Sequence, residues 1–326
     1  MRFPKNSLVA ALGVFFACAG VPAAASQAGY PQEPVKLVVS YAAGNVTDLV
    51  ARMIGEKLST LWKQSVLVEN RPGAGGSLGA AMVAKARPDG YTLLFSAVAA
   101  LAVNPHIYKN VHYDPLKDFD YITLTVAMPL VCVVNSKSEI KDFPGLIRYS
   151  KEHPGALNYG SAGSGTISHL TMETLKAKYQ LNTTHVPYKA SSAVMTDLLG
   201  GRIQVACEPA TVTTPLVKAG TLRAIGITSS QVLPSMPEVP TVASQIGPFS
   251  SGAWLGMLAP KGTPPAIVKK INSDLQTILK DPGFQAKMSQ LGIEVLAEGP
   301  ADFKKRERQD YDQYGAIVKR LNMKVD

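Results

Sequence analysis

The chain has 326 residues, a formal net charge of +9 and three cysteines. Its basic residues are dispersed apart from one run at 304–308, which indicates a solvated helix face rather than a surface for nucleic acid. The histidines and cysteines show neither HExxH nor CxxC spacing, so a metal site has no support and we expect no cofactor.

The first 25 residues have the layout of a secretory signal peptide. Arg2 and Lys5 form a basic start, an apolar run covers 8–19, and small residues occupy 23–25. The apolar run is too short to span a bilayer, and no later segment is long and apolar enough to do so. We therefore expect cleavage after Ala25, export to the periplasm and a soluble mature protein.

After residue 25, short β-branched runs alternate with amphipathic segments, which is typical of a parallel sheet with crossover helices. The first group has strands at 35–41, 65–70 and 91–97 and helices at 47–62 and 77–87. The second group has strands at 129–135, 157–162, 183–188, 202–208 and 222–228 and helices at 143–153, 166–179, 191–201 and 211–220. A proline-rich segment at 229–248 breaks the pattern, and a strand at 254–260 and helices at 264–281 and 300–321 follow it.

This order of elements predicts an α/β fold of two lobes, each a doubly wound, mostly parallel sheet with flanking helices. In the simplest topology, lobe 1 comprises 26–126 plus about 229–326, with the last helices able to cross between lobes, and lobe 2 comprises 127–228. The two crossings place a cleft between the lobes, and ligands of open α/β sheets bind beyond the carboxyl ends of the strands.

Two cysteines remain after export. Cys132 and Cys207 both lie in apolar, strand-like runs, "LVCVV" and "IQVACE". We expect buried free thiols, with a disulfide between them as the alternative.

Two of the strand-to-helix loops belong to the first lobe. In "SYAAGNVTD", Gly44 allows a tight turn, Asn45 or Thr47 can cap the helix, and Asp48 can accept from amides of the first helical turn. Asp48 is interpreted either as a site residue or as a plain capping residue. The loop "ENRPGAGGSLG" does not fit the dinucleotide fingerprint, because Leu78 stands where the third glycine belongs, so it is predicted to be a structural turn.

The stretch "NYGSAGSGTISHL" at 158–170 allows three hypotheses. A phosphate loop lacks its lysine, because Gly165 directly precedes Thr166. A hydrolase elbow lacks GxSxG around Ser161 and Ser164, although either serine could meet His169 or His185 in space. The third hypothesis is a carboxylate site, in which Ser161, Ser164 and Thr166 add hydroxyls to the free N–H groups at a helix start.

The loop "HVPYKASSAVMTDLLGG" repeats this arrangement. Tyr188 and Lys189 end a strand, and Ser191 and Ser192 begin a helix. Two helix N-termini facing one cleft favour one carboxylate between them, or two carboxylates on one ligand.

Most of the mature chain resembles one family. The resemblance rests on segments such as "YPQEPVKLVV", "VENRPGAGGSLGAAMVAKARPDGYTLL", "LNYGSAGSGTISHL", "HVPYKASSAVMTDLLGGRIQV" and "WLGMLAPKGTPPAIVKKIN". The family is that of the periplasmic receptors of tripartite tricarboxylate transporters, called TctC-like or Bug-type proteins. It implies a Venus-flytrap fold, one small carboxylate in the cleft, delivery to a membrane permease of two other subunits, and no catalytic role.

The resemblance also implies which residues hold the ligand. The loops that bind the carboxylate correspond here to Ser161, Ser164, Gly165, Thr166, Tyr188, Lys189, Ser191 and Ser192, and the loop that closes over it corresponds to Tyr41, Ala43, Gly44, Asn45 and Asp48. Two departures concern the ligand: the first loop lacks the usual proline- and glycine-rich run, and Glu208 stands where an aspartate is common. The remaining alternatives are an exported serine hydrolase and a sensor for a membrane signalling protein, and the expected state is a monomer.

Overall fold

The computed structural model describes residues 29–229 and 231–324. The predicted signal peptide lies outside the described residues, and the fold described below is that of the unit from Pro31 onward. No described helix is both long and apolar enough to cross a bilayer.

The first half of the sheet contains the early strands and two that arrive later in the chain. Its order is β2 (Val66–Asn70), β1 (Val35–Val39), β3 (Thr92–Ala97), β9 (Gly252–Pro260), β4 (Phe119–Asn135) and β10 (Glu294–Glu298). β1 runs parallel to β2 and β3, while β9 and β10 run antiparallel to their partners. The predicted crossover helices are α1 (Val46–Trp62) and α2 (Ser77–Ala84).

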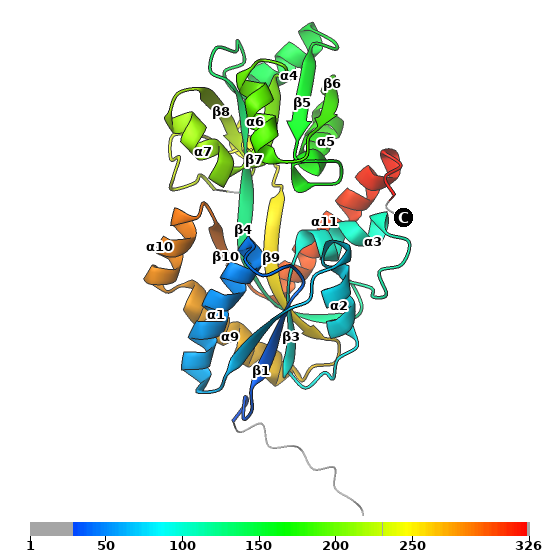
Figure 1. Ribbon diagram of the computed structural model, residues 1–326, viewed down its shortest axis with the longest axis vertical. Coiled ribbons are helices and arrows are strands. Elements are labelled where there is room, and N and C mark those ends of the chain that lie inside the picture. The colour runs from blue at the N-terminus through cyan, green and yellow to red at the C-terminus, as the bar shows by residue number, and fades with distance from the viewer. Residues whose placement is uncertain (1–28, 230, 325–326) are drawn as a thin grey trace, which may run out of the picture. The chain divides into compact units, whose positions relative to one another are not determined.

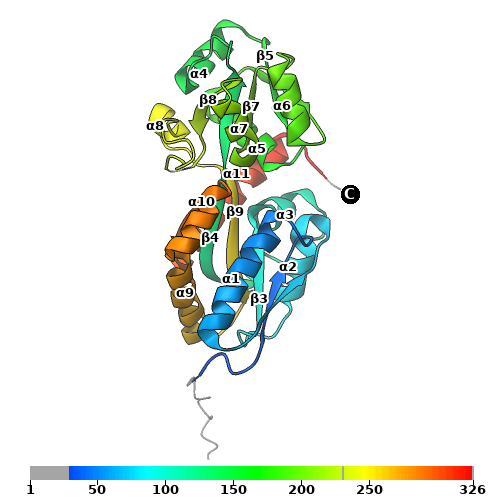
Figure 2. The ribbon, with the colours of Figure 1, turned by 60° about the vertical axis from the view of Figure 1, so that its left-hand side comes forward.

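The second half repeats this plan around the same β4. Its order is β6 (Thr183–Pro187), β5 (Leu157–Ser161), β7 (Val205–Pro209), β4 and β8 (Leu222–Ile227), as Figure 1 shows. Figure 2 shows the ribbon turned by 60° about the vertical axis. The connecting helices are α4 (Phe143–Glu152), α5 (Ile167–Tyr179), α6 (Ser191–Leu199) and α7 (Ala210–Lys218). β5 is parallel to β6 and β7, whereas β4 is antiparallel to β7 and β8. The α/β fold class is confirmed, and the sheet is mixed because β4, β8, β9 and β10 add antiparallel pairs.

β4 passes from one half of the sheet to the other. Its residues 119–129 pair with β9, and its residues 130–134 pair with β7. The predicted strand at 129–135 is therefore only the second part of a longer strand. The last pair before the change is Pro129 with Gly252. The exact lobe boundaries remain a prediction.

Several elements were not predicted from the sequence. They are short or begin at proline: η1 (Ala74–Gly76), the π-helical turn Ala99–Val103, α3 (Asn104–Ile107), α8 (Val242–Ile246) and α10 (Pro282–Gln290). The closing helices α9 (Pro265–Leu279) and α11 (Pro300–Arg320) are confirmed. The predicted turn at 71–76 is also confirmed, and the Asn104 side chain holds it by donating to the carbonyls of Ala74 and Gly75.

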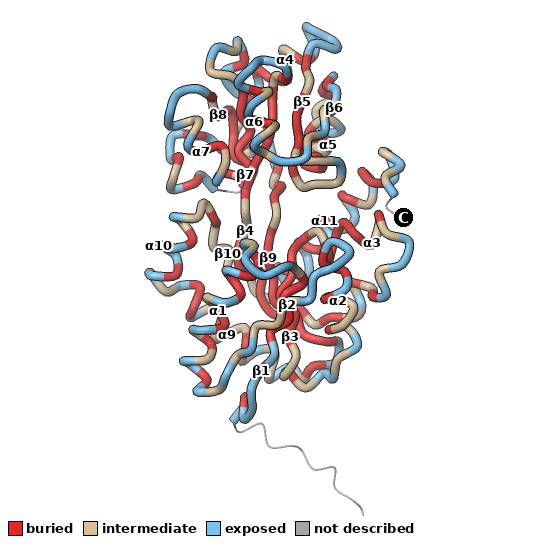
Figure 3. The backbone as a smooth tube through the Cα atoms, in the orientation of Figure 1, coloured by how far each residue is buried: buried red, intermediate tan, exposed pale blue. Residues whose placement is uncertain are grey.

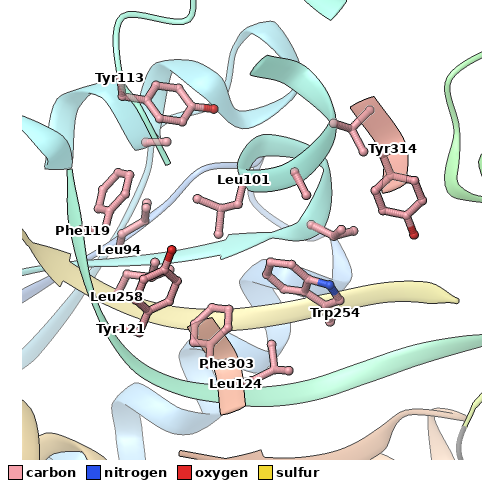
Figure 4. Packing of buried hydrophobic residues seen from close by; sticks show 14 of the residues in the cluster. Leu94, Leu101, Tyr113, Phe119, Tyr121, Leu124, Trp254, Leu258, Phe303 and Tyr314 are labelled. Atoms are coloured by element: carbon pink, nitrogen blue, oxygen red, sulfur yellow. The ribbon is translucent and has the colours of Figure 1, made fainter. Parts of the chain in front are cut away.

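The strands are buried and carry the core, as Figure 3 shows. In the first half, the rings of Trp254, Tyr121 and Phe303 meet edge to face around α11 (Figure 4). Gly256 lies directly under the Phe303 ring, where any side chain would collide with it. The Trp254 indole donates to Asp310 on α11 at 2.6 Å, so this helix is fixed to β9 by both packing and a hydrogen bond.

The two described cysteines form a disulfide, so the expectation of free thiols was wrong. Cys132 on β4 lies directly opposite Cys207 on β7, with their Cα atoms 3.9 Å apart. The sequence showed only that each lies in a buried strand. The antiparallel pairing of β4 with β7 brings them together, and this pairing is not visible in the order of elements along the chain.

Candidate functional site

A pocket of about 380 Å³ lies where the starts of α5, α6 and α7 face α1 and the segment after α10. This volume is within the range of roughly 300–1,000 Å³ usual for small-molecule sites. The lining residues are Val46, Leu49, Met128, Pro129, Leu130, Ala162, Thr166, Ile167, Ser168, Ser191, Glu208, Pro209, Ala210, Thr211, Ala253, Leu291, Gly292 and Ile293. A larger hollow of about 720 Å³ lies beside β4 and α9, where Lys261 is paired with Asp120, and it contains none of the predicted site residues.

Three helix N-termini supply the donors of the pocket. Thr166 caps α5 through its hydroxyl, which accepts from the N–H of His169. α6 and α7 follow Ala190 and Pro209, and neither of these residues caps its helix with a side chain. The first N–H groups of a helix have no partner within it, so the starts of α6 and α7 offer donors and a partial positive charge. An anion is the natural occupant of such a position.

Glu208 is the charged residue of the lining, and it is fully buried at the end of β7. Its Oε2 accepts from the Ser191 hydroxyl at 2.5 Å, while its Oε1 has no hydrogen-bond partner. Burial raises the pKa of Glu208, and the Ser191 hydroxyl that donates to it, with the nearby Ser168 hydroxyl and Ala162 N–H, offsets part of this rise. A protonated carboxyl with a free oxygen can donate to a ligand as well as accept from it.

The glycine-serine loop before α5 is held by its own side chains. Ser161 is buried, and its Oγ lies 2.7 Å from Nε2 of His185. Thr166 donates to the carbonyl of Gly163 at 2.7 Å, and the Gly165 N–H donates to Nδ1 of His169. These contacts fix the loop, so that the first residues of α5 face the pocket.

The Ser161–His185 pair is the closest approach to the hydrolase hypothesis. Burial, and then the neighbouring His169, lower the pKa of His185 to about 4. The two imidazole rings are stacked with their centroids 4.0 Å apart, and neither Ser161 nor His185 lines the pocket. Among the described residues, no carboxylate is hydrogen-bonded to His185, since Glu173 accepts from Tyr159 instead.

The polar side chains at the start of α1 form hydrogen bonds within the chain. The Asn45 side chain caps α1 by accepting from the Asp48 N–H at 2.9 Å. The Asp48 carboxylate accepts from the Gly44 N–H, from Asn70 and from Arg52. Burial would raise the pKa of Asp48, but the hydrogen bonds from Arg52, Gly44 and Asn70 lower it overall, so the group is ionised. Asp48 therefore acts as a capping group for this loop.

The structure brings only some of the predicted site residues together. Thr166, Ser191 and Glu208 line the pocket. The remaining predicted residues lie outside the lining: Tyr41, Ala43, Gly44, Asn45, Asp48, Ser161, Ser164, Gly165, Tyr188, Lys189 and Ser192. Of these, Tyr41 packs its ring against Gly76, Tyr188 donates to Asp197 at 2.8 Å, and Ser164, Lys189 and Ser192 are exposed.

The residues missed from the sequence are mostly apolar. Val46 and Leu49 project from the first turn of α1, and Leu291 and Ile293 follow α10. Val46 and Leu49 are 41% and 39% exposed, which is unusual for the apolar residues of an amphipathic helix. The only sequence signal for this wall of the pocket was the pair of apolar residues, Val46 and Leu49, on the exposed face of α1. Nothing in the sequence places residues 291–293 near this helix.

The comparison with protein families decides which kind of protein this is. A model described as the tripartite tricarboxylate transporter family receptor, TctC, matches residues 50–323. The chain belongs to this receptor family. It is 39% identical over 279 residues to an Agrobacterium vitis protein, "UPF0065 protein in the TAR-I ttuE-ttuC' intergenic region", covering 85% of this chain and 80% of that one. It is 31% identical to Protein BugT of Bordetella pertussis, covering 98% of each.

Solved structures agree with this assignment. The receptor is similar to the periplasmic binding protein BugD, with a TM-score of 0.65 and 35% identity over 91% of this chain and all of that one. The receptor is also similar to two Rhodopseudomonas palustris proteins, each 29% identical to it. The structure of Rpa4515 with adipate has a TM-score of 0.69 and covers 91% of this chain and all of that one. The structure of MatC with bound malate has a TM-score of 0.65 and covers 89% of this chain and all of that one. The chain is thus a solute-binding receptor of the periplasmic type and not an enzyme, so the Ser161–His185 pair has a structural role.

Proposed function

We propose that this receptor captures a small carboxylate in the pocket beside Glu208 and delivers it, in the periplasm, to a membrane permease of two other subunits. The observation that carries the proposal is the convergence of the starts of α5, α6 and α7 on one pocket of about 380 Å³. Partial positive charge and free N–H groups suit an anion that must later be released, because no covalent bond or metal holds it. Two similar solved structures hold adipate and malate, which are small carboxylates.

The other predicted contacts remain part of this proposal. Ser164, Lys189 and Ser192 are exposed near the starts of α5 and α6, and Tyr41, Ala43 and Gly44 lie in the loop before α1. Periplasmic receptors close around their ligands by hinge motion. Such a motion would bring the exposed loop residues toward the ligand, and delivery to the permease would follow from the closed form. The proposed state of the free receptor is a monomer.

Thermal-shift screening of the ligand-stripped receptor against a panel of carboxylates tests the proposal. A carboxylate that binds the folded state raises the melting temperature by mass action, and isothermal calorimetry then gives its Kd. If no carboxylate in the panel shifts the melting temperature or produces heat, the proposal fails.

Ser191→Ala tests the place of binding. Ser191 holds Glu208 Oε2 and lines the pocket, so its loss should weaken the binding of the best carboxylate by roughly tenfold, equivalent to about 1.4 kcal/mol. The matched control is Ser273→Ala, which removes an exposed helical serine on α9 outside the pocket. Equal affinities for the two variants would argue against this pocket.

A further inference from the structure

The pocket is divided into a polar end and an apolar end. Its polar side chains all come from residues 162–211: Thr166, Ser168, Ser191, Glu208 and Thr211. The side facing them, from 46–49, 253 and 291–293, contributes Val46, Leu49, Ala253, Leu291, Gly292 and Ile293, and has no polar side chain. None of the lining residues is Lys, Arg or His. A ligand that fills the pocket therefore meets donors at one end and hydrocarbon at the other.

The backbone of the apolar end offers few donors either. The N–H groups of Leu291, Gly292 and Ile293 all donate to carbonyls of α10, at 2.9–3.3 Å. The Leu49 N–H donates to the Asn45 carbonyl at 3.0 Å. A second carboxylate placed against 291–293 would lose its hydration without gaining hydrogen bonds from these N–H groups, which is strongly unfavourable for a charge.

The start of α1 already holds an anion. The ionised Asp48 carboxylate lies in the first turn of this helix, where it accepts from the Gly44 N–H and pairs with Arg52 at 3.0 Å. The partial positive charge of this helix start is thus compensated from within the chain. Because Asp48 also pairs with Arg52, this helix start leaves no uncompensated positive charge for a second carboxylate near Val46.

At the polar end, one buried group lacks a partner. Glu208 is fully buried, lines the pocket and leaves its Oε1 without a hydrogen bond. When Glu208 is protonated, Oε1 can donate to a ligand carboxylate, which has only acceptors and supplies the partner that this buried group lacks. Ser191 at the start of α6 donates to Glu208, and α7 begins two residues after Glu208, so the starts of both helices supply the remaining donors for one carboxylate.

We propose that the receptor selects monocarboxylic acids with an apolar body, with the carboxylate seated between Glu208 Oε1 and the helix starts and the apolar body against Val46, Leu49, Leu291 and Ile293. Di- and tricarboxylates are disfavoured, because their second charge would lie at the apolar end. This inference rests on the proposed carboxylate-binding function and narrows it to one ligand class.

Hexanoate and adipate test the inference directly, because they share a six-carbon chain and differ by one terminal carboxylate. Calorimetry with the ligand-stripped mature receptor should give a Kd for hexanoate that is roughly tenfold or more below the Kd for adipate. Benzoate should also bind more tightly than malate. Tighter binding of adipate or malate overturns the inference and leaves the proposed function intact. Absence of binding by any carboxylate overturns both.

The variant Leu49→Lys tests whether the apolar end of the pocket determines the selectivity for monocarboxylates. A cation at the apolar end should weaken the binding of hexanoate and strengthen the binding of adipate. The ratio of the Kd for hexanoate to the Kd for adipate should therefore rise by roughly tenfold. Leu61→Lys is the control, since Leu61 is 49% exposed on the same helix but does not line this pocket. An unchanged ratio in Leu49→Lys, or an equal change in Leu61→Lys, contradicts the placement of the apolar body.

Discussion

Glu208 is an acidic residue inside a pocket for which we propose an anionic ligand. Its surroundings explain how the Glu208 carboxyl and a ligand carboxylate can lie in the same pocket. The residue is fully buried, and the groups that act on its carboxyl are Ser191, Ser168 and the Ala162 N–H, none of which is charged. No other described residue of the pocket lining is ionisable. Burial without a cation favours the protonated carboxyl, which donates a hydrogen bond and does not repel a ligand.

The affinity for a carboxylate should therefore fall as the pH rises through the raised pKa of Glu208. Below that pKa the neutral carboxyl donates to the ligand, and above it two negative charges face each other. Calorimetry at pH values on both sides of the raised pKa of Glu208 measures this dependence. Glu208→Gln keeps a donor at this position and should bind with little change over the same range. An affinity of the unaltered receptor that is constant or rises with pH would contradict this role.

The sequence could identify the polar residues of the site better than the apolar ones. Thr166, Ser191 and Glu208 follow strands at positions where parallel sheets bind ligands, and this rule needs only the order of elements. Asp48 also follows a strand of the parallel sheet, but its carboxylate accepts hydrogen bonds from Gly44, Asn70 and Arg52. Asn70 and Arg52 reach Asp48 only in the folded chain, so its role could not be decided from local sequence.

At the scale of elements, β4 determines the architecture. It pairs with β9 and β10 in one half of the sheet and with β7 and β8 in the other. The sequence predicted its second part from the apolar run "PLVCVVN" and missed the first part, Phe119–Met128. The βαβ units around β1 and β5 are local and were predicted. The antiparallel pairs join distant segments, and periodicity carries no information about such partners.

The Cys132–Cys207 disulfide joins β4 to β7 across a sequence separation of 75 residues. Constraining so long a loop in the unfolded chain stabilises the native state by about 2–4 kcal/mol. We expect the variant with both Cys132→Ala and Cys207→Ala to lose about this amount of unfolding free energy in urea titrations.

A reducing agent provides the control for that experiment. It should destabilise the unaltered receptor and leave the double variant unchanged. Because Glu208 follows Cys207 directly on β7, the double variant should also bind carboxylates less tightly. Equal unfolding free energies for the oxidised receptor and the double variant would argue against the bond.

For the molecule as a whole, the two halves of the sheet are connected at a point where the backbone leaves no room for a side chain on Gly252. β4 leaves β9 after the pair Pro129–Gly252, and Met128 and Pro129 both line the pocket. Gly252 has φ +151°, and a Cβ there would lie 2.9 Å from the Met128 carbonyl oxygen. The backbone at this crossing is thus both the connection between the halves and part of the pocket wall.

Gly252→Ala should therefore affect stability and binding together. The added methyl group must displace Met128 or strain the backbone, at a cost of about 1–3 kcal/mol of unfolding free energy. The displaced pocket wall should weaken carboxylate binding, measured by calorimetry beside the urea titration. Gly200→Ala is the matched control, because its φ is −76° and its nearest contact is an ordinary 3.4 Å, so both quantities should stay near those of the unaltered receptor. A Gly252→Ala variant that loses stability but binds normally would show that the crossing supports the fold without shaping the pocket.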